Sequence, residues 1–412
     1  MDDPTQAAGG TPRDPGSGVQ ADRHVAAGAL SPATAADEVV EGSAATPSEV
    51  LESPISGVSI QQGLLAWLGI VSLGGIGCVL LGHAEGAVFF AAAGAFALAQ
   101  ATDAAASLER YREFVREQLP ERSAHGWIFR TVIRSLVPAG GALMYAALGV
   151  YAMNADPDHP QRFTAGWCAF AALVSLSTIY RPIADAAMRL FFGSTPGRTR
   201  RLTARLLVLA LLLPVPGVML GPSLMATVRS NGTPLADPAS LVAQMLGELA
   251  IALAGVGWFV RRDTRAVLVR LGITGMRPGY FLVGAMGLLA IVGLNSGSDW
   301  VQHRFFPMLW AQDRDVTRYI AGGLTFTTAV LLGISAGVGE EVAIRGALQP
   351  RLGILLSAIV FATGHVQYTW FGMSTIALLG VLLGVVRGRS NTTTAILVHV
   401  TYDIYAALTA NG

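Results

Sequence analysis

The chain contains no lysine and few charged residues of either sign. Charged residues make up 13% of its 412 residues and hydrophobic residues 52%, whereas soluble chains carry about 25% charge. All 28 basic residues are arginine and the net charge is only +1, so we expect no basic face for a nucleic acid. The composition predicts an integral membrane protein, with the lipid bilayer as its solvent.

Cysteine is almost absent. Cys78 and Cys168 both lie in apolar stretches, where a lone thiol usually packs as a small hydrophobic group. They predict neither a disulfide nor a cysteine metal site. The first 18 residues lack a basic segment followed by an apolar core, so we expect no secretory signal peptide and insertion through an internal span.

Apolar runs long enough to cross about 30 Å of hydrocarbon recur along the chain. They predict an all-α fold, a polytopic transmembrane bundle of about 11 spans. Residues 1–56 are rich in small and polar residues, which predicts a disordered cytoplasmic tail. We expect N-terminal transmembrane helices of unknown role at 57–278 and a catalytic transmembrane core at 279–412. The expected spans are 64–82, 86–106, 132–153, 164–180, 202–221, 241–260, 279–295, 320–338, 354–371, 374–386 and 393–409.

Arginine collects in three of the loops between these spans, at 110–130, 181–201 and 261–277. Basic residues in short loops are retained on the cytoplasmic side of a membrane. The alternation predicts a cytoplasmic N-terminus, and it places the end of the eighth span and the turn at 387–389 on that same side.

Ionisable residues stand within or beside apolar helices in the last part of the chain, where a functional site is the first hypothesis because such groups are costly in hydrocarbon. Glu341 and Arg345 are four apart, so they can form an ion pair that leaves Glu340 to face a cavity. His399 and Asp403 share one helical face in the same way. A third expected helix, 354–371, contributes His365.

One carboxylate and two imidazoles in a membrane support two schemes of hydrolysis. A partly buried glutamate can take a proton from water while a histidine orients that water and a polar pair stabilises the oxyanion. Alternatively, the same residues can hold a zinc ion whose bound water attacks. The residues alone leave both schemes open, and a purely structural ion pair at Glu341 and Arg345 is a third reading. Glu248, within 241–260, needs a polar partner but suggests no chemistry of its own.

Three motifs follow one another along the chain: Glu340-Glu341-x-x-x-Arg345, Phe361-x-x-x-His365 and His399-x-x-x-Asp403. Together they resemble the CPBP family of intramembrane endopeptidases, which includes type II CAAX prenyl endopeptidases and bacteriocin-processing and self-immunity proteins. The resemblance covers about 325–409, under a quarter of the chain.

The resemblance implies a role for each motif residue. Glu340 corresponds to the general base, His365 to the histidine that positions the attacking water, and His399 with residue 403 to the pair that stabilises the oxyanion. The supporting pair that orients and neutralises the site corresponds to Glu341 and Arg345. Relatives often carry asparagine at the last position, and Asp403 can donate a hydrogen bond only when protonated.

The implied activity is hydrolysis of a peptide bond near a membrane anchor, in CAAX-type, bacteriocin-maturation or C-terminal sorting processing. The expected substrates are membrane proteins, lipidated proteins or peptide precursors, and the expected location is a bacterial inner membrane. No soluble cofactor and no metal ligand are assigned, with zinc as the alternative, and the oligomeric state is not indicated. The competing hypotheses are a peptide- or lipid-binding immunity protein with the same fold and a transporter, which the lack of an internal repeat disfavours.

Overall fold

The computed structural model describes residues 57–115, 124–156, 158–193, 197–230 and 236–410, and within these ranges every regular element is a helix. The predicted all-α class is therefore confirmed. The predicted tail at 1–56 lies outside the described residues.

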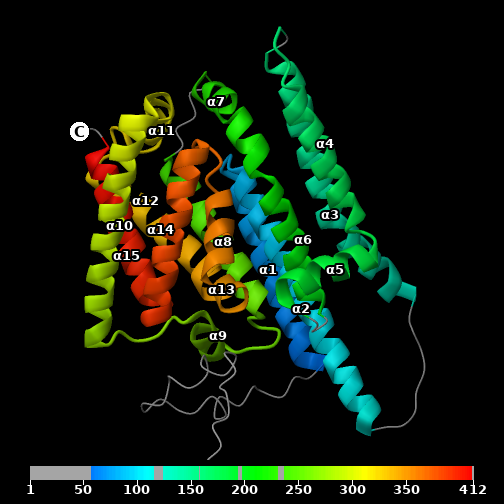
Figure 1. Cartoon of the computed structure of the whole chain (residues 1–412). Coiled ribbons are helices and arrows are strands. Elements are labelled where there is room, and N and C mark those ends of the chain that lie inside the picture. The colour runs from blue at the N-terminus through cyan, green and yellow to red at the C-terminus, as the bar shows by residue number, and fades with distance from the viewer. Residues whose placement is uncertain (1–56, 116–123, 157, 194–196, 231–235, 411–412) are drawn as a thin grey trace, which may run out of the picture. The chain divides into compact units, whose positions relative to one another are not determined.

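The N-terminal helices pack mainly as neighbours in sequence. Helix α1 runs along α2, α2 also contacts α8, and α3 and α4 lie side by side as a hairpin (Figure 1). The bounds are α1 Gly57–Leu80, α2 Ala84–Val115, α3 Ala124–Asn154, α4 Arg162–Ser177, α5 Arg181–Phe192, α6 Arg198–Leu212, α7 Pro214–Ser230, α8 Pro238–Val256 and α9 Thr264–Leu271.

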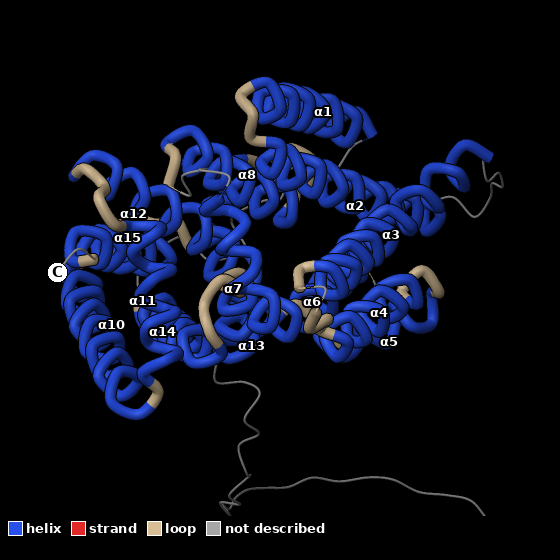
Figure 2. The backbone as a smooth tube through the Cα atoms, turned by 90° about the horizontal axis from the view of Figure 1, so that it is seen from above, coloured by secondary structure: helices blue, strands red, loops and turns tan. Residues whose placement is uncertain are grey.

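The C-terminal helices contact one another across greater distances in the sequence. Helix α12 contacts both α8 and α15, and α10 lies against α14 and α15 (Figure 2). The elements are α10 Pro278–Phe305, α11 Pro307–Ala321, α12 Phe326–Glu341, a π-helical segment η1 Val342–Leu348, α13 Gln349–Thr363, α14 Trp370–Arg389 and α15 Thr392–Thr409.

Among the described residues, seven helical segments are long and apolar enough to cross a membrane, or nine if two bent pairs, α4 with α5 and α6 with α7, each form one span. The prediction of about 11 spans differs from this number for two reasons. The run from α12 through η1 to α13 counts as one segment of 38 residues, although its backbone leaves the helical conformation at Gly353, with φ 73° and ψ 178°, directly before the predicted ninth span begins. Helix α15 carries His399, Asp403 and several threonines, so it falls short on apolarity.

Glycine allows α12 to approach α15 closely. A Cβ at Gly337 would lie 2.9 Å from the backbone nitrogen of Val400, and one at Gly333 would lie 2.8 Å from its carbonyl oxygen. Small residues at such crossings let two helix backbones meet in a membrane protein. The crossing brings the C-terminal end of α12 beside the middle of α15.

The start of α15 is fixed to the linker that follows α9. Asn391 caps α15 by accepting from the backbone N–H of Thr394, and its side-chain amide donates to the hydroxyl of Thr274. The hydroxyl of Thr392 donates to the carbonyl of Leu271 at 2.6 Å. These contacts set the position of the helix that carries His399.

Candidate functional site

The acidic pair stands where α12 passes into a π-helical turn. Glu340 and Glu341 are the last residues of α12, and Arg345 lies within η1. Short π-helical insertions are frequent at functional sites, because the extra residue in the turn redirects the side chains that follow it. Here the insertion still leaves Glu341 and Arg345 facing each other.

The expected ion pair between Glu341 and Arg345 is present and fully buried. Nη1 of Arg345 lies 3.1 Å from Oε1 of Glu341, and neither side chain is exposed. Nη2 of Arg345 donates to the carbonyl of Gly380 at 3.2 Å, and the guanidinium carbon lies 4.4 Å from the ring centroid of Phe361. A buried charge is tolerated only with a partner, and here each side chain supplies the other's. The contacts of Arg345 with Phe361 and Gly380 also connect η1 to α13 and α14.

His399 joins the three carboxylates of the site. Its Nδ1 lies 2.9 Å from Oε1 of Glu341. Its Nε2 lies 3.4 Å from Oδ2 of Asp403 and 4.0 Å from Oε2 of Glu340. An imidazolium at this position would donate from both nitrogens, whereas a neutral ring has one donor and one acceptor. The predicted convergence of His399 and Asp403 is therefore observed.

Glu340 is held by no hydrogen bond in the described part of the chain, and its ion-pair contact there is Nε2 of His399 at 4.0 Å. Its side chain is 17% exposed, and its Oε2 is buried without a hydrogen-bond partner among the described residues. Glu341, in contrast, contacts both Arg345 and His399. Helical spacing predicts that Glu341 pairs with Arg345 and that Glu340 stays outside this pair, and the geometry agrees with both predictions.

His365 reaches the site indirectly. Helix α13 ends at Thr363, so the expectation that His365 projects from within a helix is wrong, because it lies in the loop that follows. Its Nδ1 is 3.1 Å from the carbonyl oxygen of Phe361. The Phe361 ring lies 5.0 Å from the ring of His365 and 5.9 Å from that of His399, centroid to centroid. In the described part of the chain, no hydrogen bond or ion pair joins His365 to Glu340.

Asp313, in α11, holds the loop that carries His365, and the sequence patterns did not single it out. Its carboxylate accepts from the backbone N–H of Thr369 at 2.6 Å, from the hydroxyl of Thr369 at 2.7 Å and from the amide of Gln302 at 2.6 Å. Thr369 in turn caps α14. No motif spacing links α11 to this loop, so local sequence offered no signal for the role.

Glu248, in α8, is a fourth carboxylate at the site. It lies close enough to Glu340 and His399 for their charges to interact, and its Oε2 is buried without a hydrogen-bond partner among the residues described. Gln244 donates to its other oxygen at 3.0 Å. A side chain at Gly339 would collide with Glu248. The sequence indicates that this glutamate lies inside an apolar span and needs a polar partner. It does not indicate which helices pack beside it and supply its neighbours.

Tyr368 adds a proton donor near the carboxylates. Burial raises the pKa of its hydroxyl, and the charges of Asp313 and Asp403 act in the same direction, whereas the contact with Thr317 opposes the shift. The hydroxyl lies 3.4 Å from that of Thr317. The raised pKa keeps Tyr368 neutral, and therefore a donor, at physiological pH.

The side chains as they stand do not fit a zinc site. Throughout the described residues, no group of three or more histidine, cysteine, aspartate or glutamate side chains is arranged to hold a metal ion. Both nitrogens of His399 already face carboxylates, and His365 lies apart from them.

Comparison with known proteins agrees with the motifs. Residues 322–405 match the family model "Type II CAAX prenyl endopeptidase Rce1-like". Over 138 residues, 33% of this chain and 70% of the relative, the sequence is 25% identical to "Uncharacterized protein YpbD" of Bacillus subtilis (strain 168). No solved structure matches significantly. All six predicted site residues lie within the matched segment. The chain therefore carries an Rce1-like domain of the CPBP family, a family of peptidases, over residues 322–405.

Proposed function

We propose that this protein is an intramembrane endopeptidase that uses water activated by Glu340. The observation that carries the proposal is the free carboxylate of Glu340 beside His399, whose Nε2 lies 4.0 Å from it. A general base needs an acceptor oxygen without a competing donor and a neighbouring group that can stabilise developing charge. Both features occur here inside an Rce1-like domain.

The proposed reaction begins when Glu340 takes a proton from a water molecule and the resulting hydroxide attacks the carbonyl carbon of the scissile bond. His399, tethered through Nδ1 to Glu341, donates from Nε2 to the oxyanion of the tetrahedral intermediate. When the intermediate collapses, the carbon–nitrogen bond breaks and Glu340 returns its proton to the leaving nitrogen. The products are a carboxylic acid and an amine, which become a carboxylate and an ammonium ion when the acid proton passes to the amine, and Glu340 is again ionised.

The two remaining motif residues take positioning roles in this scheme. His365 orients the water from the loop that Asp313 holds. Asp403 contacts the same nitrogen of His399 that faces Glu340, so it orients the ring. Because the carboxylate of Asp403 donates only when protonated, the donor to the oxyanion is assigned to His399.

The proposed substrates carry a membrane anchor: lipidated proteins, single-span proteins or peptide precursors. Such substrates reach a site whose glutamates, Glu340 and Glu341, stand in a helical segment apolar enough to lie in a bilayer. The proposed setting is a bacterial inner membrane, with the arginine-rich loops and the N-terminus in the cytoplasm.

The test is cleavage of a fluorogenic lipidated peptide by the full-length protein in vesicles. Glu340→Gln and His365→Ala are expected to lower kcat by about 10²- to 10⁴-fold, the usual contribution of acid–base catalysis. Asp299→Asn is the matched control, because among the described residues this exposed carboxylate accepts only from Trp310. Equal rates in wild type and Glu340→Gln would exclude the proposed base.

Two alternatives give different outcomes in the same assay. A binding or immunity protein would retain the peptide without turnover, and its binding would survive Glu340→Gln. A zinc-dependent enzyme would lose activity with a chelator and regain it with added zinc, whereas the proposed reaction is unaffected by chelation.

A further inference from the structure

A cavity of about 280 Å³ lies outside the peptidase site, between the N-terminal helices and the Rce1-like domain. Its walls come from α2, α6, the turn between α8 and α9, and the junction of η1 with α13. Since a water molecule takes about 30 Å³ in the liquid, the cavity has room for a phosphate group and part of what carries it.

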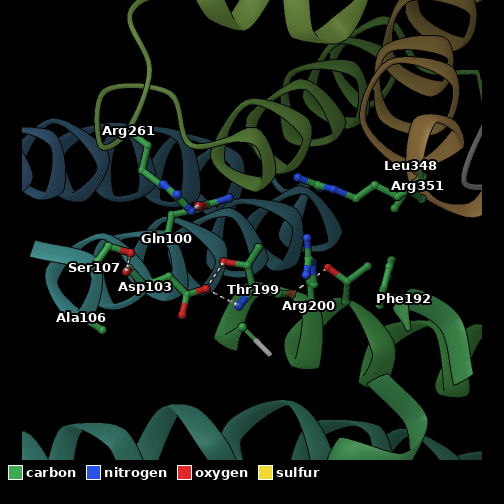
Figure 3. Close-up of a pocket in the computed structure, with 12 residues that line it drawn as sticks. Gln100, Asp103, Ala106, Ser107, Phe192, Thr199, Arg200, Arg261, Leu348 and Arg351 are labelled. Carbon is green, nitrogen blue, oxygen red and sulfur yellow. Dashed lines mark hydrogen bonds between the residues drawn. The ribbon is translucent and has the colours of Figure 1, made fainter. Parts of the chain in front are cut away.

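Three arginines line this cavity. Arg200 extends from α6, Arg261 from the turn after α8 and Arg351 from α13, and in Figure 3 the three side chains point toward a common space from different sides. Their charges interact unfavourably, because Arg351 lies within the electrostatic reach of Arg200, Arg261 and Arg262. Like charges held this close cost free energy unless an anion lies among them.

Few acidic side chains among the described residues lie near the arginines. Asp103 is the only acidic one of the described residues that line the cavity, and its oxygens already accept from the backbone N–H groups of Arg198 and Thr199 and from the hydroxyl of Thr199. Among the described residues, the side chain of Arg351 has no hydrogen-bond or ion-pair partner. The cavity is therefore a positive site with an unused donor.

The positive region extends beyond the cavity. Burial, followed by the charges of Arg351, Arg262 and Arg387, lowers the pKa of Arg270 to about 10, and Nε of Arg387 is buried without a partner among the described residues. Ser107, Thr203 and Gln100 complete the cavity wall, and each of these side chains already donates to a backbone carbonyl. The arginine guanidinium groups are therefore the groups that would bind phosphate oxygens, which they hold in a fork geometry in many proteins.

We propose that this arginine-lined cavity binds a phosphate group and that its ligand stabilises the contact of the N-terminal helices with the Rce1-like domain. The phosphate could come from an anionic phospholipid headgroup or from a soluble phosphate. In either case it bridges Arg351 of the domain to Arg200 and Arg261 of the N-terminal part. Its role is distinct from the chemistry at Glu340, and the test needs no turnover.

The experiment measures thermal unfolding of the full-length protein in nanodiscs of phosphatidylcholine, with and without phosphatidylglycerol, at constant ionic strength. Phosphatidylglycerol is expected to raise the unfolding midpoint of the wild type by about 3 °C or more. Arg351→Gln and Arg261→Gln are each expected to raise about tenfold the phosphatidylglycerol concentration that gives half of this shift, because each removes a charge-assisted contact. Arg265→Gln is the matched control, because this exposed arginine of α9 does not line the cavity.

A second variant and a second ligand make the outcome decisive. Ala106→Glu places a carboxylate in the cavity wall, and it should raise the midpoint in phosphatidylcholine alone and abolish the response to phosphatidylglycerol. Inorganic phosphate, titrated into phosphatidylcholine nanodiscs with sulfate-free buffer, identifies a soluble source if it stabilises the wild type saturably. The proposal is overturned if neither ligand stabilises the wild type, or if Arg351→Gln and Arg261→Gln both respond as the wild type does.

Discussion

The buried pair of Glu341 and Arg345 yields the sharpest stability prediction. Both side chains are fully buried, 3.1 Å apart, and Glu341 also holds His399 at 2.9 Å. Arg345→Met keeps most of the volume but leaves Glu341 with a charge that only His399 can compensate. Removing one partner of a buried pair costs about 3–5 kcal/mol, a large share of the 5–15 kcal/mol by which proteins are typically stable.

The matching double variant tests whether the cost arises from charge. Glu341→Gln combined with Arg345→Met removes both charges together, and we expect about 1–3 kcal/mol of the single-variant loss to be recovered as coupling energy. The assay is denaturant unfolding in detergent micelles for the wild type, both single variants and the double variant, with Arg265→Met as an exposed control. A cost for Arg345→Met below about 1 kcal/mol, or strictly additive effects in the double variant, would refute the pairing argument. Activity should stay low in the double variant, because a neutral glutamine at position 341 holds His399 less strongly.

The remaining predictions concern packing around the site. Gly337→Val should destabilise the fold by about 1–3 kcal/mol, because the new side chain meets the backbone of Val400; retained stability in the same unfolding assay would show that α12 and α15 are not in close contact. Asp313→Asn should loosen the loop that carries His365. We expect faster amide hydrogen exchange in this loop and a lower kcat, and unchanged exchange would show that the carboxylate does not hold the loop. Glu248→Gln should stabilise the protein by about 1 kcal/mol, since it removes one of two interacting carboxylate charges; a loss of stability would show that the charge of Glu248 is needed.

Local spacing was sufficient for several features of the site. Residues four apart on a helix face the same way, so the pairing of Glu341 with Arg345 and of His399 with Asp403 followed from the chain alone. The all-α class followed from apolar runs of membrane-crossing length. The same reasoning left Glu340 as the free carboxylate, in agreement with its geometry.

The number of spans and the ends of the helices are predicted less well from residue spacing and hydropathy. Hydropathy ends the eighth span at 338, whereas the helix continues through η1 into the first turn of α13 before the backbone leaves the helical conformation at Gly353. It also extends the ninth span past Thr363, and so places His365 in a helix when it lies in a loop. Hydropathy indicates that a segment can be buried in a bilayer or a protein core. It does not indicate where the helical pattern of backbone hydrogen bonds changes or ends.

The contacts that complete the site depend on helix crossings between distant parts of the chain. Glu248 meets Glu340 because α8 packs on α12, and Asp313 reaches the loop after α13 from α11. Arg351 likewise meets Arg200 only because α13 lies near α6. Periodicity within one helix determines which face a residue occupies, and it therefore predicts partners one turn away. It contains no information on which other helix will cover that face, and this choice arises from the packing of the whole bundle.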